Sequence, residues 1–209
     1  MKKKHTELLL PDTFYHVYNR GINGETVFKS EKHYGLFLEK YAYHIEPIAS
    51  TFAYCLLGNH FHFLLKTRTE NEILINAQIQ YPGKEIDSLP HFISKQFSHL
   101  FNGYSQAINK GSSRTGNLFE TPFRRIEVKH DVYFSQLVWY IHHNPQRHRF
   151  VKDFRDYPHS SYQSHLHKKA TKLQRNEVLH LFGDANEYIN YHNIQRDEVQ
   201  IWDLMIEFD

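Results

Sequence analysis

The chain has 209 residues, of which 40% are hydrophobic and 23% are charged, and its formal net charge is +2. These values are typical of a globular domain with its own core and exclude a disordered chain. The single cysteine, Cys55, excludes an intramolecular disulfide, and no apolar run approaches the length that spans a membrane. We therefore expect a soluble, cytoplasmic protein.

Positive charge is concentrated in one third of the chain. Residues 110–175 contain 13 Lys and Arg against five Asp and Glu, a net charge of +8, whereas the remaining residues together carry −6. A localised positive surface indicates a polyanionic partner, and nucleic acid is the first candidate. A basic face that only contacts solvent is the ordinary alternative.

The first part of the chain predicts alternating strands and helices. The expected elements are a strand at 13–19, a helix at 32–44 and two strands at 49–57 and 61–66. Ser30 is expected to be the N-cap of the helix, and Gly58-Asn59 is expected to form the turn of a hairpin between the two later strands. The polar residues 68–90 include Pro82-Gly83 and predict an irregular segment.

The second part continues the alternation. The expected elements are a helix at 92–109, a basic loop at 110–117, a short strand at 123–128, and a helix from Asp131 to His143 that stops at Asn144-Pro145. The order β-α-β-β-α-β-α favours an α+β fold with a ferredoxin-like antiparallel sheet and helices on one face. We divide the chain into a nuclease domain at 1–167 and a small helical extension at 168–209, which ends in an acidic stretch.

The most informative motif is His60-Phe61-His62, at the start of an apolar strand. Successive side chains of a strand alternate between its two faces, so His60 and His62 project from the same side. Two imidazoles at this spacing can share one metal ion, which would satisfy polar groups in apolar surroundings. With 17 histidines, chance triplets also occur. A second triplet, His165-Leu166-His167, lies in polar sequence and is interpreted as surface.

Tyr140 and Asn144 are candidate partners for the two histidines, because residues four apart share one face of a helix. A tyrosine hydroxyl can attack phosphorus and form a covalent phosphotyrosine, but an ordinary phenol has a pKa of about 10 and needs assistance. A divalent cation supplies it by polarising the phosphate. With Asn144 as a third ligand, two nitrogens and one oxygen suit Mg²⁺ or Mn²⁺. The ordinary alternatives are a core tyrosine and an asparagine that ends a helix before Pro145.

Two other groups of residues compete for these roles. Tyr104 is a rival nucleophile, but it lies on the apolar stripe of the 92–109 helix and is interpreted as a packing residue. His142-His143 lie before an expected helix end, and we interpret them as meeting phosphate or water rather than a metal.

Five motifs in chain order resemble those of the single-tyrosine HUH transposases, specifically the REP-associated tyrosine transposases. The motifs are Tyr15-His16-Val17-Tyr18-Asn19-Arg20-Gly21, Asn59-His60-Phe61-His62-Phe63-Leu64-Leu65, Arg114-Thr115-Gly116-Asn117-Leu118-Phe119-Glu120, Tyr140-Ile141-His142-His143-Asn144-Pro145 and Tyr157-Pro158-His159-Ser160-Ser161-Tyr162. The resemblance covers residues 13–165. The chain departs from the family at Gly58, Thr121-Pro122 and Arg149, where a proline, a Gly-Arg pair and a glycine are usual.

The resemblance implies a metal-dependent endonuclease and strand transferase that nicks and rejoins single-stranded DNA beside a hairpin. The reaction would pass through a 5′-phosphotyrosine and a free 3′-hydroxyl. It implies Tyr140 as the nucleophile, His60 and His62 as ligands of Mg²⁺ or Mn²⁺, and Asn144 as the third ligand. The basic residues expected to hold the DNA backbone are Arg114, Arg124, Arg125, Arg147 and Arg149. Both a monomer and a homodimer are compatible with this activity.

Two other functions would use the same scaffold. A non-cleaving, domesticated hairpin-binding protein would have no use for a metal-bound nucleophile. A metal-dependent hydrolase would attack with water and would need no tyrosine. Formation of a covalent protein–DNA adduct distinguishes the three functions.

Overall fold

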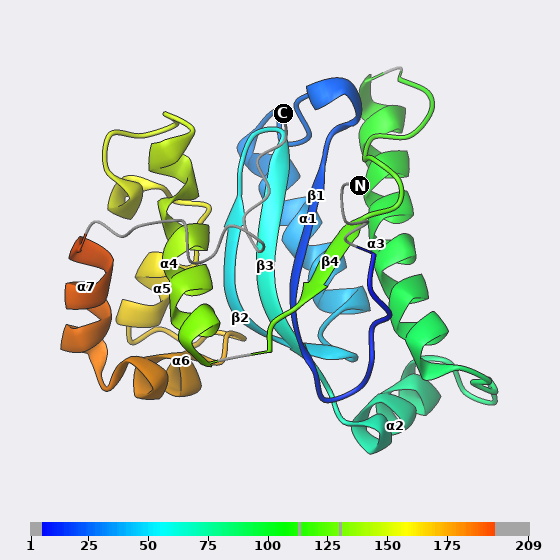
Figure 1. Cartoon of the computed structure of the whole chain (residues 1–209). Coiled ribbons are helices and arrows are strands. Elements are labelled where there is room, and N and C mark those ends of the chain that lie inside the picture. The colour runs from blue at the N-terminus through cyan, green and yellow to red at the C-terminus, as the bar shows by residue number, and fades with distance from the viewer. Residues whose placement is uncertain (1–5, 113, 130, 195–209) are drawn as a thin grey trace, which may run out of the picture.

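A four-stranded sheet forms the centre of the molecule (Figure 1). The computed structural model describes residues 6–112, 114–129 and 131–194. The strands are β1 (Phe14–Arg20), β2 (Ala49–Leu56), β3 (His60–Thr67) and β4 (Arg124–Glu127). Their order in the sheet is β2-β3-β1-β4, and each neighbouring pair is antiparallel. The predicted α+β class, its antiparallel sheet and the hairpin between β2 and β3 are confirmed.

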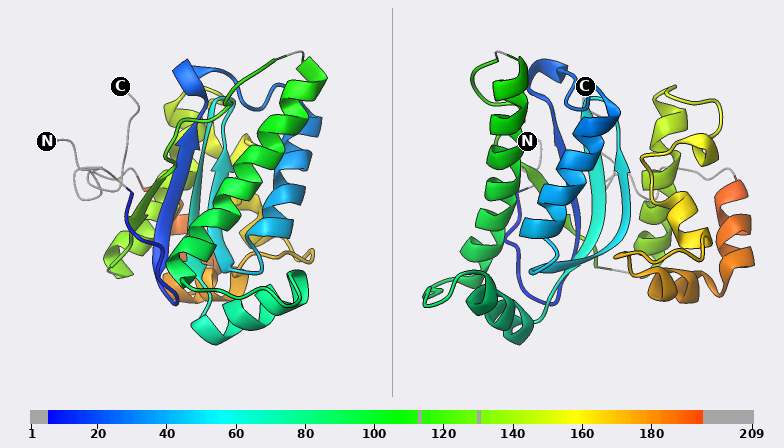
Figure 2. Two further views of the ribbon diagram at one scale, coloured as in Figure 1. Left: turned by 90° about the vertical axis from the view of Figure 1, so that its right-hand side faces the viewer. Right: turned by 180° about the vertical axis from the view of Figure 1, so that it is seen from behind.

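Helices cover both faces of this sheet (Figure 2). One face packs against α1 (Glu31–His44) and α3 (Leu89–Ser112), and the other packs against α4 (Asp131–Arg147). The helices beyond α4 are α5 (Tyr162–Leu166), α6 (Arg175–Phe182) and α7 (Ala185–Asn193). We had expected helices on one face only. The second layer follows from β3, whose residues are buried on both faces except at Lys66, because such a strand needs cover on each side.

The first face holds an aromatic core. On β3 it presents Phe61, Phe63 and Leu65. The helix α3 packs against them with apolar residues at helical spacing: Phe92, Ile93, Phe97, Leu100, Phe101, Tyr104 and Ile108. Because strand side chains alternate, the same strand must turn His60 and His62 to the opposite face, toward α4.

Residues 68–90 contain a helix, α2 (Glu70–Gln80), where we expected an irregular segment. A capping box starts this helix: the Thr69 hydroxyl accepts a hydrogen bond from the Glu72 N–H, and the Glu72 carboxylate accepts one from the Thr69 N–H. This reciprocal arrangement satisfies two backbone donors that a helix start leaves unpaired. The Thr-x-x-Glu spacing was therefore the signal that the polar composition concealed.

We predicted that the helix beginning at Asp131 stops at Asn144-Pro145. The helix α4 instead continues to Arg147. Proline removes one backbone donor from a helix, which usually ends or kinks it. Here both Asn144 and Pro145 are buried. Their carbonyls accept hydrogen bonds from the N–H groups of His148 and Phe150, at 2.9 and 2.8 Å. Burial and these two bonds hold the last turn in place beyond the proline.

Two helices, α6 and α7, form in the C-terminal region that was expected to be helical, and the acidic stretch after them lies outside the described residues. Two short 3-10 helices, Ile22–Gly24 and Phe154–Asp156, complete the chain. Among the described residues, no helix is long and apolar enough to cross a membrane.

Candidate active site

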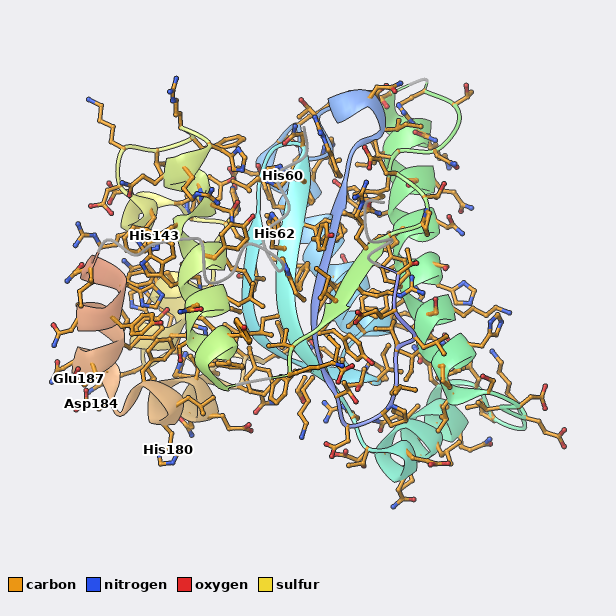
Figure 3. All side chains as sticks on the ribbon, in the orientation of Figure 1. His60, His62, His143, His180, Asp184 and Glu187 are labelled. Carbon is orange, nitrogen blue, oxygen red and sulfur yellow. The ribbon has the colours of Figure 1, made fainter. Side chains whose placement is uncertain are left out.

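The strand β3 and the helix α4 bring the predicted site residues together. The ring of Tyr140 meets the ring of His62 edge-on, with centroids 5.6 Å apart, and His60 lies perpendicular to His62 at 5.3 Å. One turn after Tyr140, Asn144 donates its Nδ2 to the Tyr140 carbonyl at 2.8 Å. All four side chains are buried. Figure 3 shows His60 and His62 in succession along β3.

The hydrogen bond of His60 defines its tautomer. The Asn59 amide donates Nδ2 to the Gly24 carbonyl at 3.5 Å, so its Oδ1 is the atom that meets His60 Nδ1, at 2.7 Å. An amide oxygen only accepts, and therefore His60 Nδ1 carries the proton. The lone pair of the neutral ring then lies on Nε2, the atom through which this imidazole would bind a metal.

The rings of His60 and His62 are neutral at physiological pH. Burial lowers the pKa of His60 to about 3, with further contributions from the positive charges of His148 and Arg20. Burial also holds the pKa of His62 well below its usual value, and His16 lowers it further. Neutral imidazole is the form that binds metals, so the site is ready to ligate without first losing a proton.

The Asn144 side chain has one buried oxygen without a hydrogen-bond donor in the part of the chain that the structure describes. Its Nδ2 is committed to the Tyr140 carbonyl, so Oδ1 points away from that contact. This oxygen is buried, and no donor among the described residues lies within hydrogen-bond distance of it. An unsatisfied buried acceptor costs about 1–3 kcal/mol. Two imidazole nitrogens and one such oxygen fit Mg²⁺ or Mn²⁺. Within the described residues no group of three or more His, Cys, Asp or Glu side chains could hold a metal, so a third ligand beside His60 and His62 would have to be of another type.

Three arginines lie around this site. The Arg147 guanidinium lies 5.1 Å from the centroid of the Tyr140 ring. On the sheet, Arg20 is directly opposite His60 in the β1–β3 pair, and Arg124 is opposite Tyr18 in the β1–β4 pair. Because Tyr18 is itself opposite His62, all three arginines belong to the face that carries the histidines. This face is therefore positively charged, which suits a phosphate group.

The other predicted DNA-contacting arginines are placed differently. Arg125 projects from the opposite face of β4, where it donates to the Glu7 carbonyl and lies 4.7 Å from the Phe123 ring. Arg114 holds its own loop, with hydrogen bonds to Glu25 at 3.0 Å and to a loop carbonyl at 2.8 Å. Arg149 is exposed and has a φ of 61°, a conformation that favours glycine.

We had expected His142 to meet phosphate or water. It is instead buried and belongs to a chain of hydrogen bonds between protein groups. Its Nδ1 is 2.9 Å from Nε2 of His192, and its Nε2 is 2.8 Å from the Ser161 hydroxyl. His192 Nδ1 donates to the Tyr188 carbonyl, and the Tyr54 N–H donates to Ser161. The Tyr54 N–H can only donate and the Tyr188 carbonyl can only accept, so the direction of every bond between them is fixed. Ser161 therefore donates to His142, and His142 donates to His192.

His165 is also placed differently from its prediction. It is 1% exposed rather than on the surface, because α5 turns it toward Tyr188 and His142. Burial lowers its pKa to about 4. We refer to His142, His165 and His192 as the interhelix histidines. Their neighbour His143 is likewise buried on the side of α4 that faces the C-terminal helices (Figure 3).

Sequence reasoning missed three residues at the site. His16 lies 3.0 Å from His62, Asn59 orients His60, and the ring of His148 lies 4.9 Å from that of His60. The period-two pattern of β1 was a usable signal for His16, since it places this residue on the face of Tyr18. We refer to His16, His60 and His62 as the site histidines.

The rival tyrosine, Tyr104, lies on the other side of the sheet. It has no exposed surface, and its hydroxyl donates to the Val27 carbonyl at 3.1 Å. Its ring packs edge-on against Phe37 in the aromatic core. These contacts match its interpretation as a packing residue.

Comparison with known proteins adds one relationship. A scan against protein-family models finds no match, and neither does a search of curated proteins. Among solved structures, a REP-associated tyrosine transposase bound to a REP hairpin is similar, with a TM-score of 0.58 and 14% sequence identity. The match covers 77% of this chain and 82% of that one. At this identity the likeness shows a shared fold.

Proposed function

We propose that this protein is a metal-dependent transposase that nicks and rejoins single-stranded DNA beside a hairpin, with Tyr140 as its nucleophile. The observation that carries the proposal is the contact of Tyr140 with His62, on a helix that also presents the unsatisfied oxygen of Asn144. The similar solved structure supports the choice of substrate, because that protein is a transposase bound to a DNA hairpin.

The chemistry requires one bond to form while another breaks. The Tyr140 Oη–P bond forms as the P–O3′ bond of the DNA breaks, and the phenol loses the proton that the leaving 3′ oxygen gains. The phosphotyrosine keeps the energy of the phosphodiester, so the reverse reaction with another 3′-hydroxyl rejoins strands without ATP. The Arg147 guanidinium beside the ring would place positive charge next to the phosphate that Tyr140 attacks.

The residues that would hold Mg²⁺ or Mn²⁺ are His60 and His62, through Nε2, and Asn144, through Oδ1. When bound, the cation polarises the scissile phosphate and neutralises part of its charge. The chain itself keeps both imidazoles neutral by burial and directs the Asn144 oxygen by fixing the amide on the Tyr140 carbonyl. Arg20, Arg124 and Arg147 surround the same face and would contact neighbouring phosphates.

DNA must open the site before it can react. Tyr140 is 1% exposed, and the three proposed ligands are at most 4% exposed. A phosphate therefore reaches the Tyr140 hydroxyl only when the groups over it move aside. This requirement predicts a slow step that precedes chemistry and depends on DNA binding.

The test is a covalent adduct on a single-stranded hairpin with unpaired flanks, incubated with Mg²⁺ or Mn²⁺ and separated under denaturing conditions. The wild-type protein should give a shifted band. Tyr140→Phe removes one hydroxyl and should abolish that band while hairpin binding persists. Tyr104→Phe is the matched control and should form adduct at a near-normal level.

The outcomes separate the competing functions. A band that persists in Tyr140→Phe contradicts the proposed nucleophile. Hairpin binding by the wild-type protein without any adduct or cleavage indicates a non-cleaving binding protein. Metal-dependent cleavage without an adduct indicates a hydrolase that uses water.

A further inference from the structure

His16 is an imidazole buried in the middle of β1. It has no exposed surface and lies on the sheet face that α4 covers. Burying such a polar ring costs free energy unless its nitrogens are hydrogen-bonded. Its Nε2 is 3.0 Å from Nδ1 of His62, and the two rings are stacked with centroids 5.2 Å apart. The ring of Tyr18 packs against both and fixes their planes.

This hydrogen bond has two possible directions, and only one permits His62 to bind a metal. If His16 Nε2 carries the proton, His62 Nδ1 accepts it, and the second nitrogen of a neutral His62 must then carry a hydrogen. Neither nitrogen of His62 would be left with a lone pair for a cation. If His62 Nδ1 carries the proton instead, its Nε2 lone pair is available.

We infer that His16 is a positioning residue: it accepts the hydrogen bond from His62 Nδ1–H and thereby makes Nε2 of His62 the metal-binding atom. The inference rests on the metal site of the proposed function. Asn59 performs the same task for His60, where an amide oxygen accepts from Nδ1. Each of the two histidine ligands thus has its own acceptor. For His60 it is the adjacent residue Asn59, and for His62 it is His16 from the neighbouring strand. Partners of this kind orient the ring and raise its basicity.

The alternative is that His16 only fills space between Tyr18 and Tyr140. Packing depends on the size and shape of the ring, whereas positioning depends on an acceptor at Nε2. Three substitutions separate the two. His16→Phe keeps a ring but has no acceptor, His16→Gln keeps an oxygen close to the Nε2 position, and His16→Asn is polar but too short to reach His62.

The first measurement is Mn²⁺ binding to the full chain, followed by titration calorimetry or by the EPR signal of the unbound ion. We expect His16→Phe and His16→Asn to weaken Mn²⁺ binding by about 10- to 100-fold, the usual loss when such a partner is removed. His16→Gln should stay within a few-fold of the wild type. His165→Phe is the matched control, because it removes another buried imidazole, one that packs against His142 and Tyr188 rather than against His62, and it should leave the affinity unchanged.

The second measurement is the ¹⁵N chemical shifts of the His62 ring in the metal-free protein. They should report Nδ1–H in the wild type and in His16→Gln, and a mixture of tautomers in His16→Phe and His16→Asn. This readout keeps the inference testable if one variant folds poorly.

The outcomes distinguish this inference from the proposed function. Equal Mn²⁺ affinity and an unchanged His62 tautomer across the folded His16 variants would overturn the positioning role and leave the metal site standing. A wild-type protein that binds no Mn²⁺ would overturn the metal site and the positioning role with it.

Discussion

The site histidines and the interhelix histidines are both buried between α4 and another layer, yet their hydrogen bonds end differently. Among the interhelix histidines, His142 and His192 belong to a chain of hydrogen bonds from the Tyr54 N–H to the Tyr188 carbonyl, which uses both nitrogens of His142. The third member, His165, is buried beside this chain and is not part of it. In the site group the bonds of His60 and His62 are made by Nδ1, which leaves the lone pair on Nε2. Burial is common to both groups, and it lowers the pKa of His60 and His62 in one group and of His142 and His165 in the other.

This contrast shows which property of a buried histidine points to function. A ring whose two nitrogens both have protein partners fixes the position of one helix against another. A ring that is held through Nδ1 has its Nε2 lone pair in the orientation that a metal ligand needs. The hydrogen bonds therefore distinguish His142 and His192 from His60 and His62, whereas burial is common to all four.

The largest expected effect comes from the site group. His60→Ala and His62→Ala should each abolish DNA cleavage, because each removes a proposed metal ligand, while the protein remains folded at the assay temperature. Nicking assays and thermal melts measure the two quantities on the same preparations. Cleavage at the wild-type rate in excess chelator would show that no metal is required.

The opposite pattern is expected in the interhelix group. His192→Leu removes the acceptor of His142 and the donor to the Tyr188 carbonyl, and unsatisfied buried groups of this kind cost about 1–3 kcal/mol each. Each kcal/mol lowers the unfolding midpoint of a chain of this size by roughly 2–4 °C. Adduct formation at 25 °C should continue. Loss of activity without loss of stability would break the distinction between the two groups.

Charge-reversal variants test whether DNA contacts the sheet face that carries the site histidines or the surface near α7. Arg124 lies on the site face and pairs with Glu120 at 3.6 Å, whereas Arg155 lies near α7 and pairs with Asp153 at 2.8 Å. Arg124→Glu should weaken hairpin binding and reduce the slope of log affinity against log salt by about one, the loss of one phosphate contact. Arg155→Glu, with a similar local ion pair, should leave the slope unchanged. Equal slopes for both variants would count against the site face.

The last expected effect is a pH dependence in the interhelix group. His165 has a folded-state pKa of about 4, below the ordinary value of 6.5, so the unfolded chain binds the extra proton between these values. Its contribution to stability is therefore complete above pH 6.5 and is lost as the pH falls toward 4, by as much as about 3 kcal/mol. The free energy of unfolding, measured by urea titration across this pH range, should depend less steeply on pH in His165→Leu than in the wild type. An unchanged pH slope would mean that His165 does not resist protonation in the folded state.

The sequence correctly predicted that His60 and His62 lie on the same face of one strand, because the alternation of side chains along a strand is a local rule. It also predicted the buried role of Tyr104 from helical spacing. It could not reveal that α4 continues past Pro145, since that depends on the burial of Asn144 by distant residues. The sequence analysis did not predict the helix α2, although the Thr69-x-x-Glu72 spacing is typical of the capping box that begins a helix.

The histidines were the hardest residues to place. Polar neighbours suggested an exposed His165, but α5 turns the ring inward. The position before a helix end suggested a solvent-facing His142, whose partners Ser161 and His192 come from segments that only the fold brings together. His16 was quoted within a motif without a role, because its contact with His62 depends on the register of β1 against β3.

The most direct test of the account identifies the amino acid that becomes attached to DNA. The wild-type adduct can be digested with a protease, the nucleotide-bearing peptide isolated, and the modified residue located by tandem mass spectrometry. The account predicts a phosphodiester on the hydroxyl of Tyr140, with the 5′ end of the cleaved strand. Attachment at Tyr18, at Tyr104 or at any residue other than Tyr140 would contradict it.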